Sequence, residues 1–151
     1  MTSVTNRNVA TKTACAIAQA AVDHAGNLGI AINVSVVDSS ATEIAFLRMN
    51  NAFLPSMGIA KDKAYTAAGF GFPTMDWKEV LAGNVQLQAG MVERPRVVTF
   101  GGGVPIVEDD VLIGAVGVSG GSEDEDIACA QAGIEAVLGA GAEGSDSPKV
   151  E

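Results

Sequence analysis

Glycines gather between positions 101 and 121, and this feature constrains the fold more than any other in the chain. Seven glycines and one proline alternate there with β-branched residues, in the segments 101–106 and 114–121. Glycine inside a strand has no side chain to pack, so it marks a bend or the close approach of another backbone or a ligand. We therefore predict a glycine hairpin (residues 101–121) against which a neighbouring subunit, a small molecule, or both are packed.

The other elements follow from hydrophobic periodicity and from capping residues. Apolar residues at three- and four-residue steps predict helices at both ends of the chain, and Ser122 with Glu125 forms a capping box before the last helix. β-branched runs joined by short turns predict antiparallel strands. The predicted helices span 5–27, 56–68, 74–81 and 122–138, and the predicted strands span 30–38, 43–49, 96–100, 104–108 and 111–119.

This order of elements predicts a single α/β domain over residues 1–140. A five-stranded antiparallel sheet is flanked by helices, because consecutive strands with short turns pair antiparallel and the long helices cover a face. Residues 141–151 are polar and small, with little to bury, and are predicted to form a flexible tail.

Composition and charge restrict the possible partners. The chain of 151 residues is 48% hydrophobic and 18% charged, with a mean hydropathy of +0.28, so we expect apolar surface to be buried in a homo-oligomer. A net charge of −9 argues against nucleic acid, whose phosphates would be repelled. There is no apolar run of the ~18 residues that a membrane span needs, and no signal-peptide pattern, so the cytoplasm is the expected location.

Metal and redox chemistry are also restricted. Cys15 and Cys129 both lie in apolar helical contexts, where cysteine more often fills core space than forms a bridge. His24 is the single histidine, which excludes a multi-histidine metal site within one chain.

Six short motifs occur in order along the chain and together resemble one known family. They are Val36-Val37-Asp38, Arg48-Met49, the stretch from Ile59 to Ala68, Phe72-Pro73-Thr74, the stretch from Gly102 to Ile106, and the stretch from Gly114 to Gly120. Over roughly residues 5–140 the sequence resembles the GlcG/HbpS/PduO-C-terminal family of haem-binding or haem-degrading-type domains. The resemblance implies a profilin-like α/β fold, a tendency to oligomerise, and binding of haem or iron.

The chain departs from the family pattern at two places. Ser40-Ala41 stands where relatives carry a glycine pair, and Asn50-Asn51 stands where they carry Asp-Gly. Asn51 tolerates the left-handed backbone that glycine usually fills. Asn50 removes a carboxylate beside the expected pocket, which weakens any metal or proton-transfer role carried over to that position.

The first functional hypothesis is a small-ligand-binding protein that holds haem or a related tetrapyrrole in a cleft lined by glycines. His24 is the candidate axial ligand of the iron, since imidazole is a common haem ligand, although it also suits a half-buried structural histidine. Gly102, Gly103 and Pro105 are the candidate cofactor-binding wall, because the bare backbone N–H groups of the glycine hairpin around them cradle anions. The same glycines also suit tight packing between subunits.

The second hypothesis is a catabolic lyase, isomerase or hydrolase acting on a small carboxylated or aromatic substrate. Arg48 or Lys63 would hold the carboxylate and Glu43 would move the proton, because a carboxyl group in an apolar setting has a raised pKa. Asp126 is a further acid–base candidate, and Tyr65 and Trp77 suit a pocket wall or the core. A purely structural, oligomeric accessory protein is the third hypothesis, and the sequence does not decide whether the protein is an enzyme.

Overall fold

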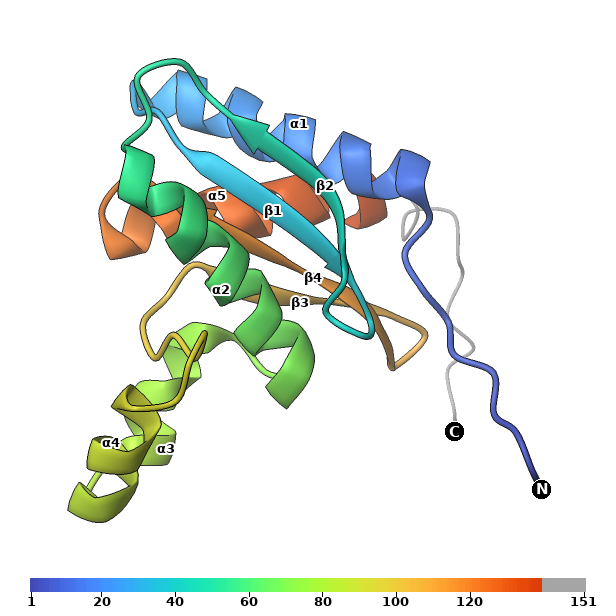
Figure 1. The fold of residues 1–151 in the computed structure, drawn as a ribbon. Coiled ribbons are helices and arrows are strands. Elements are labelled where there is room, and N and C mark those ends of the chain that lie inside the picture. The colour runs from blue at the N-terminus through green and yellow to red at the C-terminus, as the bar shows by residue number, and fades with distance from the viewer. Residues whose placement is uncertain (140–151) are drawn as a thin grey trace, which may run out of the picture.

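The computed structural model describes residues 1–139, and the predicted tail at 141–151 lies outside them. Helices and pairs of strands follow one another along the chain, as Figure 1 shows. The elements are α1 (Thr11–Leu28), β1 (Asn33–Asp38), β2 (Glu43–Arg48), α2 (Leu54–Phe70), a 3-10 turn (Thr74–Asp76), α3 (Trp77–Leu81), α4 (Val85–Val92), β3 (Gly103–Glu108), β4 (Val111–Ser119), α5 (Glu123–Ile134) and a π-helical turn (Glu135–Gly139).

Residues 1–139 form a sheet of four antiparallel strands in the order β2-β1-β4-β3. The register pairs Asn33 with Ser119 between β1 and β4, and Gly103 with Gly117 between β3 and β4. The predicted β1–β2 and β3–β4 hairpins are therefore confirmed. Strand β4, which carries the second half of the glycine hairpin, lies in the middle of the sheet.

The prediction of a fifth strand at 96–100 is wrong. Arg96 has a positive φ of 66°, which interrupts an extended run before it can pair. The Val98 N–H donates to the Thr66 hydroxyl of α2 at 3.0 Å instead of to a strand. A side chain from a helix thus satisfies the backbone that a neighbouring strand would otherwise have satisfied.

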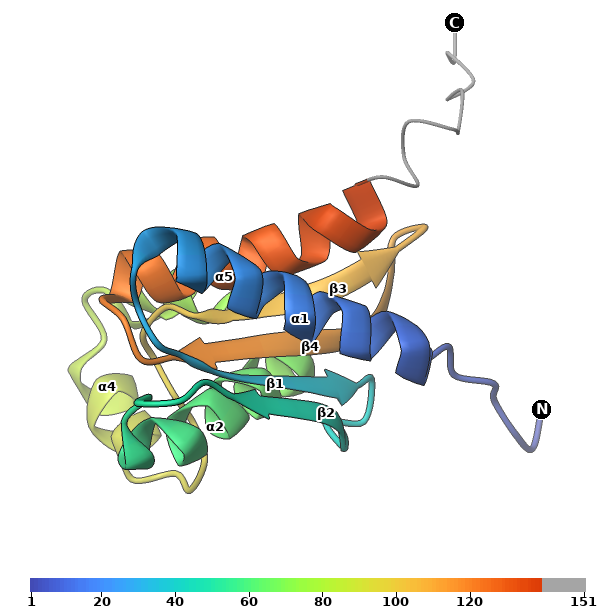
Figure 2. The ribbon, with the colours of Figure 1, turned by 90° about the horizontal axis from the view of Figure 1, so that it is seen from above.

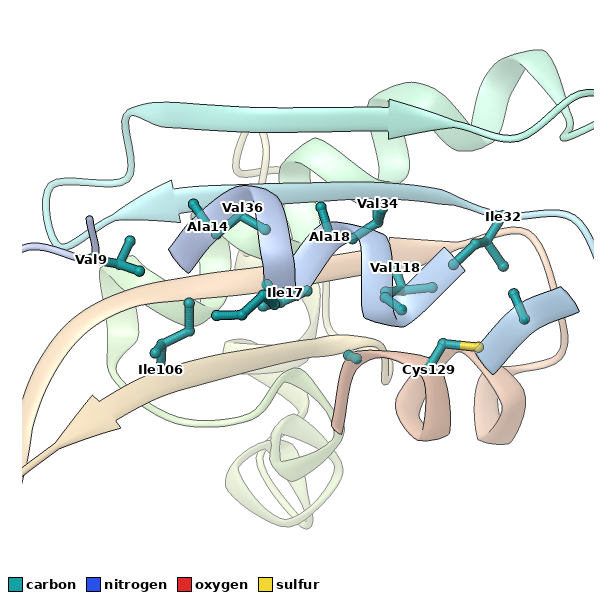
Figure 3. Packing of buried hydrophobic residues seen from close by; sticks show 14 of the residues in the cluster. Val9, Ala14, Ile17, Ala18, Ile32, Val34, Val36, Ile106, Val118 and Cys129 are labelled. Carbon is teal, nitrogen blue, oxygen red and sulfur yellow. The ribbon is translucent and has the colours of Figure 1, made fainter. Parts of the chain in front are cut away.

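Helices cover both faces of the sheet, which makes three layers (Figure 2). Helices α1 and α5 lie side by side on one face, and α2 lies on the other. The larger core lies between the sheet and the α1–α5 layer, where Ile17, Val34, Val118 and Cys129 are fully buried (Figure 3). A smaller cluster of mostly alanines lies under α2.

The glycines of β4 let α2 approach the sheet very closely. A Cβ at Gly117 would collide with the Ala60 carbonyl oxygen and with backbone and side-chain atoms of Ala64, both in α2. The short helices α3 and α4 project from this side of the molecule, away from the sheet (Figure 1). No residue of α4 is buried within the part of the chain that the structure describes. Among residues 1–139, no helix combines the length and the apolar character needed to cross a lipid bilayer.

Candidate functional site

Lys63 is buried at the centre of the contact between α2, β4 and α5. Its side chain is 1% exposed, and its Nζ atom lies 2.9 Å from Asp126 Oδ2 of α5. Nζ also donates to the Val118 carbonyl at 2.8 Å and lies 5.1 Å from the centre of the Phe100 ring. One ammonium group therefore joins a helix, a central strand and a second helix.

Asp126 is positioned by the first turn of α5, which begins where the sequence predicts. Ser122 caps the helix, and its reciprocal bonds with Glu125 confirm the predicted capping box. Asp126 Oδ1 accepts from the Gly121 N–H at 2.9 Å, so both carboxylate oxygens have partners. Because burial disfavours charge, it raises the pKa of Asp126 and lowers the pKa of Lys63, and their mutual attraction opposes both shifts.

A cavity of about 190 Å³ opens beside this pair. Lys63 and Asp126 form part of its wall, together with the hydroxyl-bearing residues Ser56 and Ser119. The rest of the wall comes from Phe53, Phe100, Gly120, Gly121 and Glu123. Phe53 is 66% exposed and Phe100 47% exposed, so two aromatic rings stand at the solvent side of a polar interior.

The space that a Cβ would occupy at Gly102 and Gly103 is filled by the protein itself, and their role as the wall of a cleft stays a prediction. A Cβ at Gly102 would lie 2.6 Å from Lys63 Nζ, and a Cβ at Gly103 would lie 2.7 Å from the Thr74 methyl group. The Gly103 N–H donates to the Thr74 hydroxyl at 2.9 Å. Two other glycines of the hairpin, Gly120 and Gly121, do line a cavity. Pro105 lies elsewhere, in a groove of about 490 Å³ between β3 and α5.

A second pocket, of about 420 Å³, lies between α2, α4 and the segment that follows α4. We call it the α2–α4 pocket. Its wall is apolar apart from the hydroxyl of Tyr65, the thioether of Met91 and the guanidinium of Arg94; the other lining residues are Gly69, Phe70, Pro95 and Val97. The Arg96 guanidinium stacks on the Tyr65 ring at 4.0 Å and binds Asp62 at 2.9 Å, which fixes the ring at the pocket wall.

A larger hollow, of about 780 Å³, lies between α3 and the start of α5. Its wall is negatively charged, whereas the wall of the α2–α4 pocket is positively charged. Lys78 is the one cation of the hollow, against four carboxylates from Asp76, Glu79, Glu123 and Asp124. An anionic ligand would therefore be repelled here and attracted to the α2–α4 pocket.

His24 lies on the other side of the sheet from both α2 pockets. His24 is half-buried in α1. It lies two helical turns after Ile17, and the Ile17 carbonyl oxygen lies close to Gly133 of α5, so this face of α1 is turned toward α5. The structure therefore separates His24 from Gly103: His24 lies in α1 on one face of the sheet, whereas Gly103 is the first residue of β3. The role of His24 as an iron ligand stays a prediction. Within residues 1–139 there is no group of three or more histidine, cysteine, aspartate or glutamate side chains arranged to hold a metal ion.

The three residues of the enzyme hypothesis do not come together. Glu43 and Arg48 stand at opposite ends of β2, which separates them by roughly 16 Å along the strand. Glu43 binds the exposed Lys61 at 3.5 Å, and Arg48 donates to the Ala52 carbonyl at 3.2 Å. Lys63 is the one of the three that faces a cavity, and its carboxylate partner is Asp126.

The fold is a three-layer α/β domain with two pockets on its α2 side. The chain belongs to the HbpS-like family: the family model described as haem degrading protein HbpS-like matches residues 9–135. The resemblance drawn from the six motifs is thereby confirmed.

Named relatives support this membership. The chain is 37% identical over 123 residues to the corrinoid adenosyltransferase PduO of Salmonella typhimurium. This match covers 80% of the chain but only 36% of the length of that protein. Among solved structures, Klebsiella pneumoniae protein ORFY is similar with a TM-score of 0.86 and 28% identity, covering 91% of this chain and 96% of that one. PduOC, solved as a complex with haem, is similar with a TM-score of 0.79 and 34% identity, covering 86% and 95%.

Proposed function

We propose that this protein binds haem or a related tetrapyrrole. The observation that carries the proposal is the similarity to PduOC, which was solved with haem and shares 34% of residues over 86% of this chain. Membership of the HbpS-like family supports the same ligand class.

The α2–α4 pocket is the site that suits such a ligand best. A tetrapyrrole needs apolar walls for its macrocycle, a donor atom for the metal, and cations for its propionate groups. Tyr65 and Met91 both carry donor groups of types that bind haem iron, and Arg94 provides the cation. The volume of about 420 Å³ lies within the range of small-molecule sites, whereas the cavity of about 190 Å³ at Lys63 is too small.

The residues that line the α2–α4 pocket fit haem chemically. Bound haem would supply a redox-active iron, and the chain would supply the apolar walls that hold the macrocycle. The stacked Arg96 fixes the ring of Tyr65, so the phenol oxygen is oriented before the ligand arrives.

A hemin titration followed by the Soret absorbance tests the proposal. We expect wild-type protein to give a shifted, saturable Soret band. Tyr65→Phe should change the band position if the phenol binds the iron, and Arg94→Gln should weaken binding by about tenfold, the effect of losing one charged contact of about 1.4 kcal/mol. Absence of a spectral change at micromolar hemin would reject the function.

His24→Ala is the matched control because His24 lies on the opposite side of the sheet. The α2–α4 pocket predicts that this variant keeps the wild-type band. A band lost in His24→Ala and retained in both pocket variants would place the iron at His24 and refute the α2–α4 site while leaving haem binding intact.

We further propose that the protein is a homo-oligomer assembled through the side that carries α3 and α4. Val85 and Val92 of α4 are 76% and 70% exposed, and Phe70 beside them is 48% exposed. Exposed apolar side chains at this density are characteristic of protein–protein interfaces. Light scattering at several protein concentrations measures the mass, and a monomer at every concentration would contradict this part of the proposal.

A further inference from the structure

The cavity beside Lys63 is not used by the proposed haem site, yet it contains the most reactive arrangement of groups among the described residues. A primary amine forms part of its wall, with a carboxylate 2.9 Å away. The hydroxyl-bearing residues Ser56 and Ser119 add hydrogen-bonding capacity, and both are more than nine-tenths buried. The amine is shielded from bulk water, but the cavity gives a small molecule access to it.

Stability alone does not explain the pair. A buried salt bridge contributes little net stability, because desolvation of two charges offsets their attraction, and apolar residues often replace such pairs without loss. A buried amine that faces a cavity and has a carboxylate within hydrogen-bond distance is, by contrast, the arrangement of a functional site.

The charges around the cavity select the kind of ligand. Lys63 is the one cation on its wall, whereas Glu123 and Asp126 both carry carboxylates. A carboxylate ligand would meet net negative charge, so an uncharged ligand is favoured. The volume of about 190 Å³ equals that of about six water molecules at roughly 30 Å³ each, so only a small ligand fits. The two phenylalanines at the opening suit a short alkyl chain.

We propose that this cavity binds a short-chain, uncharged aldehyde or ketone, which condenses reversibly with the Lys63 amine to form an imine. The nitrogen attacks the carbonyl carbon, a C–N bond forms, and the C–O bond breaks. The nitrogen loses two protons in the process, and Asp126 transfers them to the oxygen, which leaves as water. No oxidant or further reactant is needed.

Burial shifts the Lys63 amine toward the neutral form that this step requires. Burial lowers the pKa of Lys63, so more of its amine is uncharged near neutral pH than for a lysine in water. Asp126 is held by the Gly121 N–H while it faces the amine, so the proton carrier is already in place.

Reductive trapping tests the proposal on the wild-type protein without haem. The protein is incubated at pH 7 with butanal and sodium cyanoborohydride, which converts an imine into a stable secondary amine, and the modified lysines are located by peptide mass spectrometry. Lys61 is the internal control, because it lies two residues away on the same helix and its side chain is 44% exposed. We expect Lys63 to be labelled at least about tenfold faster than Lys61, because Lys63 lines the cavity that holds the aldehyde and Lys61 does not.

Two comparisons test the cavity itself. Glyoxylate, which is anionic, and naphthaldehyde, which is larger than the cavity, should label Lys63 much more slowly than butanal. Ser56→Leu, which places a larger side chain at the cavity wall and removes no hydrogen bond of the ion pair, should abolish the preference for Lys63. Labelling of Lys63 at or below the rate of Lys61, or unchanged labelling in Ser56→Leu, would overturn the proposal. Neither result depends on whether the protein binds haem.

Discussion

Removing both partners of the Lys63–Asp126 pair should destabilise the protein no more than removing one of them alone. Lys63→Met leaves Asp126 as a buried carboxylate with no cation, and Asp126→Ala leaves a buried ammonium with no anion. Each single variant should lower the free energy of unfolding by about 3–5 kcal/mol, the usual effect of leaving one buried charge unpaired. The double variant leaves neither charge behind.

The size of the coupling follows from the geometry. At 2.9 Å and an effective dielectric constant of about 20, the attraction is about 6 kcal/mol before desolvation is subtracted. The double variant still loses the bonds to the Val118 carbonyl and the Gly121 N–H, each a loss of about 1–3 kcal/mol. We therefore expect the double variant to be no less stable than either single variant, with a coupling energy of at least about 2 kcal/mol.

Urea denaturation at a fixed protein concentration measures all four proteins. Trp77 is the chain's one tryptophan, is 3% exposed and packs on Phe70 and Phe72, so its fluorescence reports unfolding. A fixed concentration is needed because association would shift the apparent stability. Losses that add to within about 0.5 kcal/mol would refute the reasoning, because they would mean that the two groups do not interact.

Three further substitutions or treatments test other parts of the structure. Gly117→Ala should destabilise the protein by about 1–3 kcal/mol or more in a thermal melt, because its Cβ would collide with α2. Gly58→Ala in α2 is the control: a Cβ there meets nothing within 4 Å, so this variant should be neutral or stabilising by up to about 1 kcal/mol. Equal effects of the two variants would contradict the close packing of α2 on the sheet. Thr66→Val should lower unfolding free energy by about 1–3 kcal/mol and speed amide exchange at Val98, whose N–H loses its acceptor; unchanged exchange would show that the bond is not formed in solution. Burial raises the pKa of Cys129 to about 11, so its thiol stays protonated at pH 8. A disulfide reagent should therefore react rapidly with the exposed Cys15 and with Cys129 only after denaturation. Rapid reaction of both thiols in the folded protein would contradict the burial of Cys129.

Local sequence signals predicted most of the scaffold. The hairpins and the last helix are confirmed because their signals are local: β-branched runs around short turns, and a capping box at Ser122. The fifth strand failed because a tertiary contact overrode a local preference. Residues 96–100 are rich in β-formers, but Thr66 from a distant helix binds their backbone first.

The glycine hairpin was predicted to mark the close approach of another group, and that part of the interpretation is confirmed. The missing side chains do mark close approach, but at Gly102, Gly103 and Gly117 the approaching groups are Lys63, Thr74 and the α2 backbone rather than a ligand. Sequence shows that space is needed at a glycine, and it does not show what fills that space.

The partner of Lys63 was the hardest feature to predict. Lys63 follows Ala60 and precedes Ala67 at helical spacing, so the pattern of buried alanines did contain a signal that it faces inward. Its pairing with Asp126 joins residues 63 positions apart, and only the packing of α2 against β4 and α5 brings them together. The α2–α4 pocket was hard to predict for the same reason, because it forms only where α4 packs near α2.

Locating the iron is the most direct test of the account. Crystals grown with hemin and measured at the iron absorption edge give an anomalous difference map that shows the metal without ambiguity. The account predicts one iron peak in the α2–α4 pocket, between Tyr65 and Met91. A peak beside His24, or hemin that is absent from crystals diffracting well, would contradict it.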